Sequence, residues 1–533
     1  MRQFIEKYNE EIAGVLSGFD RLIFRGSLRR LNYGYWHSEL GLMVASGMQQ
    51  YLWSNNIRFK DYARHVKAVS ERLKTACLRP FHEHKRPITF LRSTKASKEE
   101  MARGIAARDK IQSGLVCAIS ALEPSPTFEH RGIHIVRRER PCHVLYQYRM
   151  HPEMGWMHAR IQTWFPFNIQ IAVNGREWLA RQMDRDGIGY RKHDNCFVSI
   201  GDYARAQALL DAQLKTNWTE LLDGVAGELN PIREDIFALY PATYYWTVYQ
   251  SEWATDIVFR KAAFLERLMP ALVRHGLLSY WSGDVLRWLG RKVNRSGAIP
   301  ANFHGLVEMD LKQRPEGERI KYRMNGNAAK FYDKAYTASG SVLRAAETTI
   351  NAVEDFRVYR PKEGGPENDL QWRTMRKGIA DLHRRAEVSQ KANERLITAL
   401  ASVDDSRSVQ ELTAGIQKRT SWKKRSVRAL RPWGEDQPLL AAINHGEFVI
   451  NGFRNRDLQK LLYAAPAQSE QERRRRSAAV SRKLLLLRAH GLIQKVGKTH
   501  RYHMTDGGRM ILVAVLTSAR ATLEQLNRLE KAA

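Results

Sequence analysis

The segment from His304 to Asn351 constrains the fold more than any other part of this 533-residue chain. Apolar and polar residues alternate at roughly strand period in three runs: 304–311, 319–334 and 341–351. Turn-forming residues separate the runs, and the pair Asn325-Gly326 inside the middle run is typical of a tight hairpin turn or a bulge. We therefore expect an antiparallel meander here.

Such a meander would gather chemically active side chains: Glu308, Asp310, Tyr332, Lys334 and Glu347. Residues two apart in a regular strand share a face, so Tyr332 and Lys334 should point the same way. The same holds for Glu308 and Asp310, which we expect on the neighbouring strand. The pattern thus predicts one hydroxyl, one amine and several carboxylates close together.

The run Phe331-Tyr-Asp-Lys334, followed by Leu343-Arg344 and Glu347-Thr-Thr349, resembles the late motif of rolling-circle replication initiators. That resemblance implies a DNA-nicking enzyme in which Tyr332 attacks a phosphodiester and forms a covalent phosphotyrosine. It implies that Lys334 stabilises the developing charge. Acidic residues would hold Mg²⁺ or Mn²⁺, and the candidates are Asp20, Glu308, Asp310 and Glu347. The whole chain also resembles an uncharacterised multi-copy bacterial family, which implies a mobile genetic element.

Two departures from the initiator motif favour a different hypothesis. The chain has no His-hydrophobic-His metal motif, since the nearest string is His82-Glu-His84. One extra residue separates Arg344 from Glu347, so these two would point to opposite sides of a regular strand unless a bulge intervenes. A non-catalytic protein that clasps a structured RNA or an element end fits these departures. In that case Tyr332 would be a core or base-stacking residue.

The charge balance points to a polyanionic partner. Lys and Arg number 86 against 56 Asp and Glu, a formal net charge of +30. Such an excess usually accompanies nucleic acid, and a generally solvated basic surface is the alternative. The sequence does not decide whether the partner is DNA or RNA. It also does not decide whether the chain forms a homodimer. The residues indicate no organic cofactor.

The remaining composition favours a cytoplasmic protein without a membrane partner. The four cysteines, which form no Cys-x-x-Cys pair, are Cys77, Cys117, Cys142 and Cys196. The N-terminus has no apolar stretch of signal-peptide length, and no run approaches the length of a membrane span.

The order of elements predicts an α+β fold, a palm-like antiparallel sheet with helical insertions. Residues 1–18 have helical spacing, and a strand with Asp20 at its mouth follows. The predicted parts are an N-terminal α+β half (1–201), a helical insertion (202–300), the meander (301–365), a helical arm with a basic linker (366–436) and a C-terminal domain (437–533).

Two regions carry open alternatives. On the expected helix of the insertion, Glu252, Asp256 and Arg260 would share a face, as a metal-binding carboxylate pair or as a salt-bridged surface. Aromatic and basic residues mix over 155–180, where Arg160 and Trp164 would bind phosphates and stack bases. The alternative there is that the aromatic rings form core.

The C-terminal part, 437–533, resembles a winged helix-turn-helix domain: three helices, a strand–turn–strand wing and a closing helix. Its third helix, expected over 470–489, would enter the major groove. Nucleic-acid contacts are predicted for basic residues of that helix, the wing and the preceding linker: Arg473, Arg474, Arg475, Arg476, Arg482, Lys483, Lys495, Lys498, Arg501, Lys423, Lys424 and Arg425.

Overall fold

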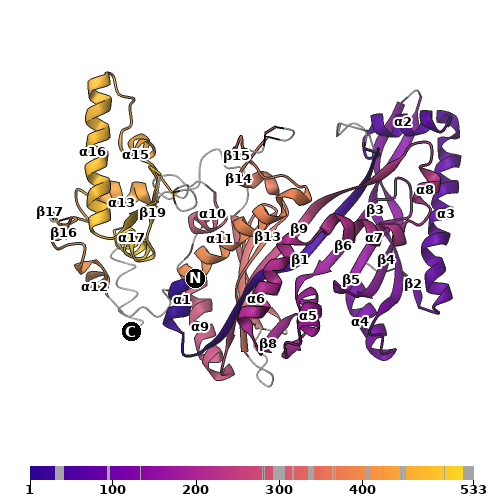
Figure 1. Ribbon diagram of the computed structural model, residues 1–533, viewed down its shortest axis with the longest axis horizontal. Helices are drawn as coiled ribbons and strands as arrows, with labels where there is room; N and C mark the ends of the chain where they lie inside the picture. The colour runs from indigo at the N-terminus through magenta and orange to yellow at the C-terminus, as the bar shows by residue number, and fades with distance from the viewer. Residues whose placement is uncertain are drawn as a thin grey trace. The chain divides into compact units, whose positions relative to one another are not determined.

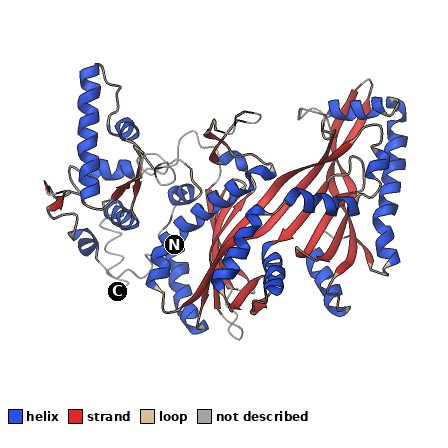
Figure 2. Ribbon diagram, in the orientation of Figure 1, coloured by secondary structure: helices blue, strands red, loops and turns tan. Residues whose placement is uncertain are grey.

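The computed structural model describes residues 1–519 except 31–40, 93–95, 133, 279, 281, 292–306, 315–316, 334–340, 363–364, 367, 402–407, 424, 445–447, 449–451 and 497–498. Three predicted site residues, Lys334, Lys424 and Lys498, lie outside these described ranges. Long strands and helices alternate along the chain (Figures 1 and 2), so the α+β class is confirmed.

Eleven strands belong to one mixed sheet with the order β10-β11-β12-β13-β9-β1-β6-β5-β4-β3-β2. Strand β2 pairs with β3 in parallel, whereas β4, β5 and β6 pair antiparallel with their neighbours. The strands of this sheet are β1 (Ile12–Arg30), β2 (Ile88–Leu91), β3 (Gly114–Arg131), β4 (His134–His151), β5 (Gly155–Gln162), β6 (Ile169–Asn174), β9 (Ala242–Phe259), β10 (Val307–Arg314), β11 (Gly317–Met324), β12 (Asn327–Asp333) and β13 (Ser341–Ile350).

The chain forms two compact units. The long-strand unit comprises residues 14–258 and 349–387. Its helices and small hairpins are α2 (Ala45–Ser54), α3 (Tyr62–Glu83), α4 (Lys98–Arg108), α5 (Gly175–Asp186), β7 (Tyr190–His193), β8 (Cys196–Ile200), α6 (Tyr203–Ala212), α7 (Trp218–Leu229), α8 (Arg233–Ile236), β14 (Arg357–Arg360) and β15 (Gln371–Thr374).

The C-terminal unit comprises residues 1–13, 259–348 and 388–533. Besides strands β10 to β13, its elements are α1 (Arg2–Lys7), α9 (Ala262–Leu278), α10 (Ser282–Trp288), α11 (Leu382–Leu400) from residue 388 onward, α12 (Val409–Ala414), β16 (Thr420–Trp422), β17 (Arg425–Val427), α13 (Gln437–Ile443), α15 (Asn455–Leu462), α16 (Glu470–Ala489), β18 (Ile493–Lys495), β19 (Tyr502–Met504) and α17 (Asp506–Ser518). Among the described residues, no helix has the length and apolarity needed to cross a membrane.

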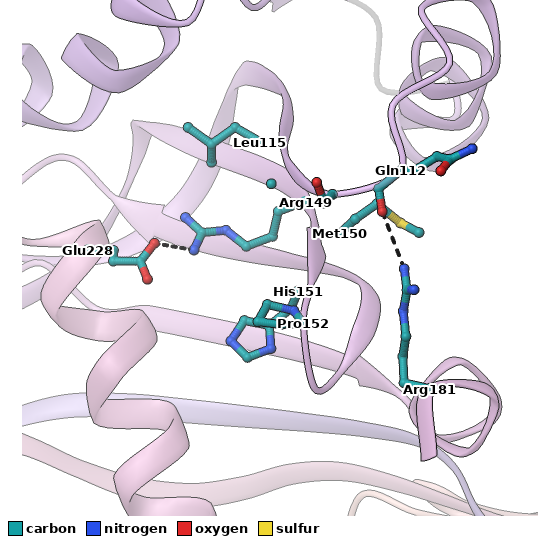
Figure 3. Close-up of a pocket in the computed structure, with 10 residues that line it drawn as sticks. Gln112, Leu115, Arg149, Met150, His151, Pro152, Arg181 and Glu228 are labelled. Carbon is teal, nitrogen blue, oxygen red and sulfur yellow. Dashed lines mark hydrogen bonds and ion pairs between the residues drawn. The ribbon is translucent and has the colours of Figure 1, made fainter. Parts of the chain in front are cut away.

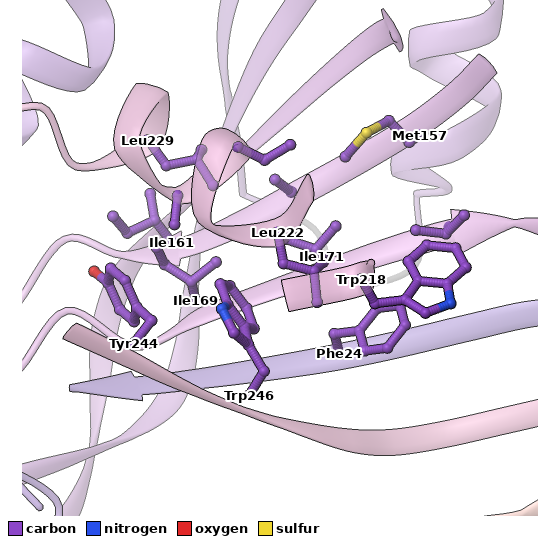
Figure 4. Close-up of a cluster of buried hydrophobic side chains, with 14 of the residues drawn as sticks. Phe24, Met157, Ile161, Ile169, Ile171, Trp218, Leu222, Leu229, Tyr244 and Trp246 are labelled. Atoms are coloured by element: carbon purple, nitrogen blue, oxygen red, sulfur yellow. The ribbon is translucent and has the colours of Figure 1, made fainter. Parts of the chain in front are cut away.

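Helix α7 covers the main core of the long-strand unit (Figure 4). Its Trp218 and Leu222 lie against Phe24 of β1 and Ile171 of β6. Alternate residues of each strand point into this layer, which is the two-residue period expected of a half-buried sheet.

Strand β9 corrects the prediction of a helical insertion over 202–300. Helices do flank it, but Ala242–Phe259 is an 18-residue strand in the main sheet. Burial alternates over its first half, where Tyr244, Trp246 and Val248 are buried. Aromatic and β-branched residues favour the pleated conformation, and this preference outweighed the helical spacing of Glu252 and Asp256.

The structure also differs from the predicted elements in two further places. The first helix stops at Lys7 and β1 begins at Ile12, so the predicted helix 1–18 is too long. The predicted linker 404–436 contains α12, β16 and β17, and its Ile416 and Val427 belong to the same apolar core as α16. These apolar residues pack into that core, although basic residues surround them in the sequence.

Candidate functional site

Tyr332 of β12 lies in a buried polar cluster of the C-terminal unit. Its hydroxyl donates to Glu347 Oε2 over 3.0 Å, and Arg344 Nη1 donates to the same hydroxyl over 3.2 Å. The ammonium of Lys330 forms a salt bridge with Glu347. Tyr332 is 8% exposed, so its hydroxyl is held by fixed partners rather than by water.

Arg344 and Glu347, which a regular strand without a bulge would place on opposite sides, contact each other. Arg344 Nη1 donates to Glu347 Oε2 over 3.0 Å, and both side chains are 1% exposed. Two cations therefore compensate the buried Glu347 carboxylate, as a buried charge requires.

Asp20 belongs to a second buried network, in the long-strand unit. Its two carboxylate oxygens each accept from Asn195 Nδ2 over 3.1 Å, and Arg176 Nε lies 3.5 Å from Oδ1. Arg176 also donates to Asp256 Oδ2 over 2.8 Å. Asp20 is therefore an interior residue of β1, and Asp256 pairs with a cation rather than with Glu252.

Close backbone approach positions Arg176 for these contacts. Gly175 begins α5, and a Cβ at this position would overlap the carbonyl oxygen of Phe19. Only glycine allows β1 to come this near. Asn174 caps the helix by accepting from the backbone N–H groups of Arg176 and Glu177.

Asp20 and Glu252 of the long-strand unit and Glu347 of the C-terminal unit each offer a carboxylate oxygen as a candidate metal ligand. Asp20 and Glu347 are buried and Glu252 is half-buried. Buried carboxylates of this kind could hold a metal ion, and carboxylate oxygens suit Mg²⁺, Mn²⁺ and Ca²⁺ alike. These carboxylates do not determine which metal ion would bind. The sequence suggested Glu252 as a metal ligand only in a helical pair with Asp256, because the helical spacing of these residues hid the strand.

The other two predicted ligands, Glu308 and Asp310, lie elsewhere. Strand β11 stands between β10 and β12, so the acids are not on the strand next to Tyr332. Both pair with Arg323, which is 2.9 Å from Asp310 and 3.6 Å from Glu308. They therefore balance the charge of the meander.

The face of the meander that carries Asp310, Lys321 and Lys330 is basic. Lys321 of β11 lies between Asp310 of β10 and Lys330 of β12 in the strand register. Burial and then the neighbouring cations Lys330, Arg323 and Arg319 lower the pKa of Lys321. The opposite face is apolar, and Tyr322 donates there to the carbonyl of Gly276 in α9.

Helix α16 carries two kinds of arginine. Arg476 is structural, because it pairs with Glu472, donates to the Ala465 carbonyl and stacks on the Tyr463 ring at 4.7 Å. Arg473 and Arg474 both reach Glu470. Two predicted residues, Arg475 and Arg482, are exposed and form no salt bridge among the described residues.

The remaining residues predicted to contact nucleic acid also differ in their exposure. Lys423, Arg425 and Lys495 are exposed, whereas Lys483 and Arg501 are half-buried. Arg160 is mostly buried and donates to Glu123 and Ser125. Trp164 packs partly against the main core. The aromatic residues around 155–180 are thus largely core, which was the alternative reading of that region.

A cavity of about 410 Å³ opens in the long-strand unit (Figure 3). Arg149 in its wall forms a salt bridge with Glu228, and Arg181 donates to the carbonyl of Gln112. Burial, and next the charge of Arg149, lower the pKa of His151. Since the cations already have partners, the cavity has no evident ligand.

Comparison with known proteins found no matching family model, curated protein or solved structure.

Proposed function

We propose that the protein binds nucleic acid through its C-terminal helices. The observation that carries this proposal is the exposed stripe of α16, where Arg475 and Arg482 lie seven residues apart, two turns of one face. Neither arginine forms a salt bridge among the described residues, so both are available to phosphates or base edges.

The surrounding elements support a winged helix-turn-helix reading. Helices α13, α15 and α16 precede the β18–β19 hairpin, and α17 follows it. Phe453 bridges to Tyr502 of β19, which adds the short third strand that winged domains use. Asn455 of α15 donates to Ser481 and to the Ser477 carbonyl, so α15 braces α16.

The test is duplex binding by the full-length chain. Arg475→Gln with Arg482→Gln should weaken binding of labelled duplex DNA about tenfold or more, because two phosphate contacts are lost. Lys67→Gln with Arg79→Gln removes the same charge from exposed positions on α3 of the long-strand unit and is the control. We also expect affinity to fall at least about tenfold between low and moderate salt. Equal effects of both variants would refute α16 as the binding element.

A second candidate function is metal-dependent nicking, favoured by the direct contact between Tyr332 and Glu347. With Mg²⁺ or Mn²⁺ bound, the metal would polarise a phosphate. Tyr332 would supply the nucleophile and Arg344 and Lys330 would stabilise negative charge. Incubation with the DNA of its own genetic element and Mn²⁺ should give a nicked strand with protein on one end. If neither DNA nor RNA is nicked with any divalent metal, binding without chemistry is the function. The link to a mobile element stays a prediction.

A further inference from the structure

One face of β1 and β9 in the long-strand unit carries an arginine–tyrosine ladder. Leu22, Phe24 and Leu28 of β1 enter the main core. The residues between them therefore point to the other face, where they include Arg25 and Arg29. The outward residues of β9 include Tyr245 and Tyr249. We call these four residues the Arg–Tyr face.

Stacking orients both guanidinium groups. The guanidinium carbon of Arg25 lies 4.1 Å from the centre of the Tyr249 ring, and that of Arg29 lies 3.6 Å from the Tyr245 ring. Cation–π contact uses the flat side of the guanidinium and leaves edge N–H groups for an acceptor. Neither arginine forms a salt bridge among the described residues.

More positive charge surrounds Arg25. Gln170 lies opposite Arg25 in the register, and its amide oxygen accepts from Arg25 Nε over 3.3 Å and Nη2 over 2.9 Å, which leaves Nη1 for a ligand. Arg160 lies opposite Gln170 on the next strand. Burial lowers the pKa of Arg25, and the charges of Arg160 and Arg137 add to that effect. Arg160 is already paired with Glu123. Exposed Arg137 is therefore the neighbouring cation that adds to the attraction of this face for a polyanion.

The ribbon β14–β15 presents a second aromatic pair. Tyr359 and Trp372 are direct cross-strand partners, with ring centres 5.6 Å apart and exposed fractions of 52% and 39%. Arg357 is exposed on the same face, two residues from Tyr359. Exposed aromatic rings beside arginine offer stacking surfaces for bases.

The segment after the ribbon lies along β9. The carbonyl of Lys377 accepts from the backbone N–H of Val248 over 2.7 Å, and Thr247 bridges to Gly378. The hydroxyl of Tyr245 is close to Gly378. The ribbon therefore leads directly to the Arg–Tyr face within the same unit.

We propose that the Arg–Tyr face and the ribbon together bind single-stranded nucleic acid. Phosphates contact the guanidinium edges of Arg25 and Arg29, and unpaired bases stack on Tyr249 and Trp372. A duplex hides the faces of its bases, so a single strand fits these exposed rings better. The inference rests on the proposed function and adds a second contact, distinct from the duplex contact of α16.

The first experiment measures binding of labelled oligothymidylate and oligouridylate to the full-length chain by fluorescence anisotropy. Arg25→Gln with Arg29→Gln should weaken single-strand binding about tenfold more than Lys67→Gln with Arg79→Gln. The control pair removes the same charge from exposed positions on α3, which packs on the other side of the sheet. Arg25→Lys with Arg29→Lys keeps the charge but should still lose affinity, because lysine lacks the planar fork.

A second measurement tests stacking. Tyr249→Leu and Trp372→Leu should each weaken single-strand binding at least about fivefold. Trp53→Leu is the control, since Trp53 is 64% exposed on α2 of the same unit. The oligothymidylate and oligouridylate arms distinguish DNA from RNA as the preferred strand.

If the Arg25 and Arg29 variants bind single strands as well as the control pair, the proposal is overturned. Equal losses for Trp372→Leu and Trp53→Leu would overturn the role of the ribbon. A chain that binds duplex but neither oligonucleotide refutes this inference alone. If the wild-type chain binds single strands but no duplex, and these variants lose single-strand binding, only the role of α16 is refuted.

Discussion

The Tyr332 hydroxyl donates to Glu347 Oε2 over 3.0 Å, inside a cluster that also holds Arg344 and Lys330. This contact joins the residue implied as a nucleophile to one of the carboxylates that can hold a metal ion. The same hydrogen bond could serve only to stabilise the interior of the fold. Removing the Tyr332 hydroxyl distinguishes this structural role from the catalytic one.

Tyr332→Phe should abolish the covalent protein–DNA adduct while leaving DNA binding intact. It should cost about 1 kcal/mol of folding free energy, since Glu347 keeps its two cations. Tyr322→Phe is the matched control, because Tyr322 also loses one buried hydrogen bond, to Gly276. Denaturant unfolding and a denaturing-gel adduct assay check both variants. An adduct formed by Tyr332→Phe would exclude Tyr332 as the nucleophile.

The carboxylate group predicts metal-dependent stability. A divalent ion that binds only the folded chain should stabilise it by about 2.7 kcal/mol at a hundredfold excess over its Kd. Glu252→Gln should remove this gain in a thermal-shift titration with Mn²⁺, whereas Asp310→Asn should keep it. If the wild type shows no shift with Mg²⁺, Mn²⁺ or Ca²⁺, these carboxylates do not form a metal site.

Asp381 should make stability depend on pH. Burial opposes its ionisation, but hydrogen bonds from the Arg376 backbone and side chain and the charge of Arg384 outweigh burial, so the pKa of Asp381 is lowered. A lowered pKa stabilises the fold above the unfolded-state value of about 4, and the gain is lost as pH falls through the folded-state value. At neutral pH Asp381→Asn should cost about 3 kcal/mol.

Chemical unfolding at several pH values checks this prediction. The difference between wild type and Asp381→Asn should shrink below about pH 4. Asp369→Asn is the control, because Asp369 is half exposed and its 3.7 Å contact with Arg373 is a surface pair. A difference that stays constant with pH would contradict the ionised state of Asp381.

The arginines of α16 should separate stability from binding. Arg476→Gln should lower the free energy of unfolding by about 1–2 kcal/mol, because Glu472, Tyr463 and the Ala465 carbonyl all lose a partner. Arg475→Gln should leave stability within about 0.5 kcal/mol and weaken duplex binding instead. Thermal melts and gel shifts on both variants decide this, and a reversed pattern would invalidate the assignment.

Gly175→Ala should be strongly destabilising, by about 3 kcal/mol or more, because the added Cβ meets the Phe19 carbonyl and forces β1 from α5. Gly224→Ala, at an exposed position of α7 with open space around it, should stabilise by up to about 1 kcal/mol. Thermal melts compare the two. A tolerated Gly175→Ala would mean that β1 and α5 shift easily.

Local signals in the sequence predicted several elements. Asn325 adopts a positive φ of 52° at the turn between β11 and β12, as the Asn-Gly pair implied. Ser97 stands before an acidic first turn, and it accepts from the Glu100 backbone N–H and caps α4. Such features depend on residues close in the chain, so the sequence alone carries them.

Partners distant in sequence were decided by the tertiary structure. Glu252 has a spacing to Asp256 that suits a helix and a strand equally, and only pairing with other strands made β9 extended. Whether Arg160 was free or paired depended on Glu123, which is 37 residues away. The sequence by itself determined the strand period, the turns and the basic excess. Burial and pairing, which depend on long-range packing, determined which of those charged residues remain available to a ligand.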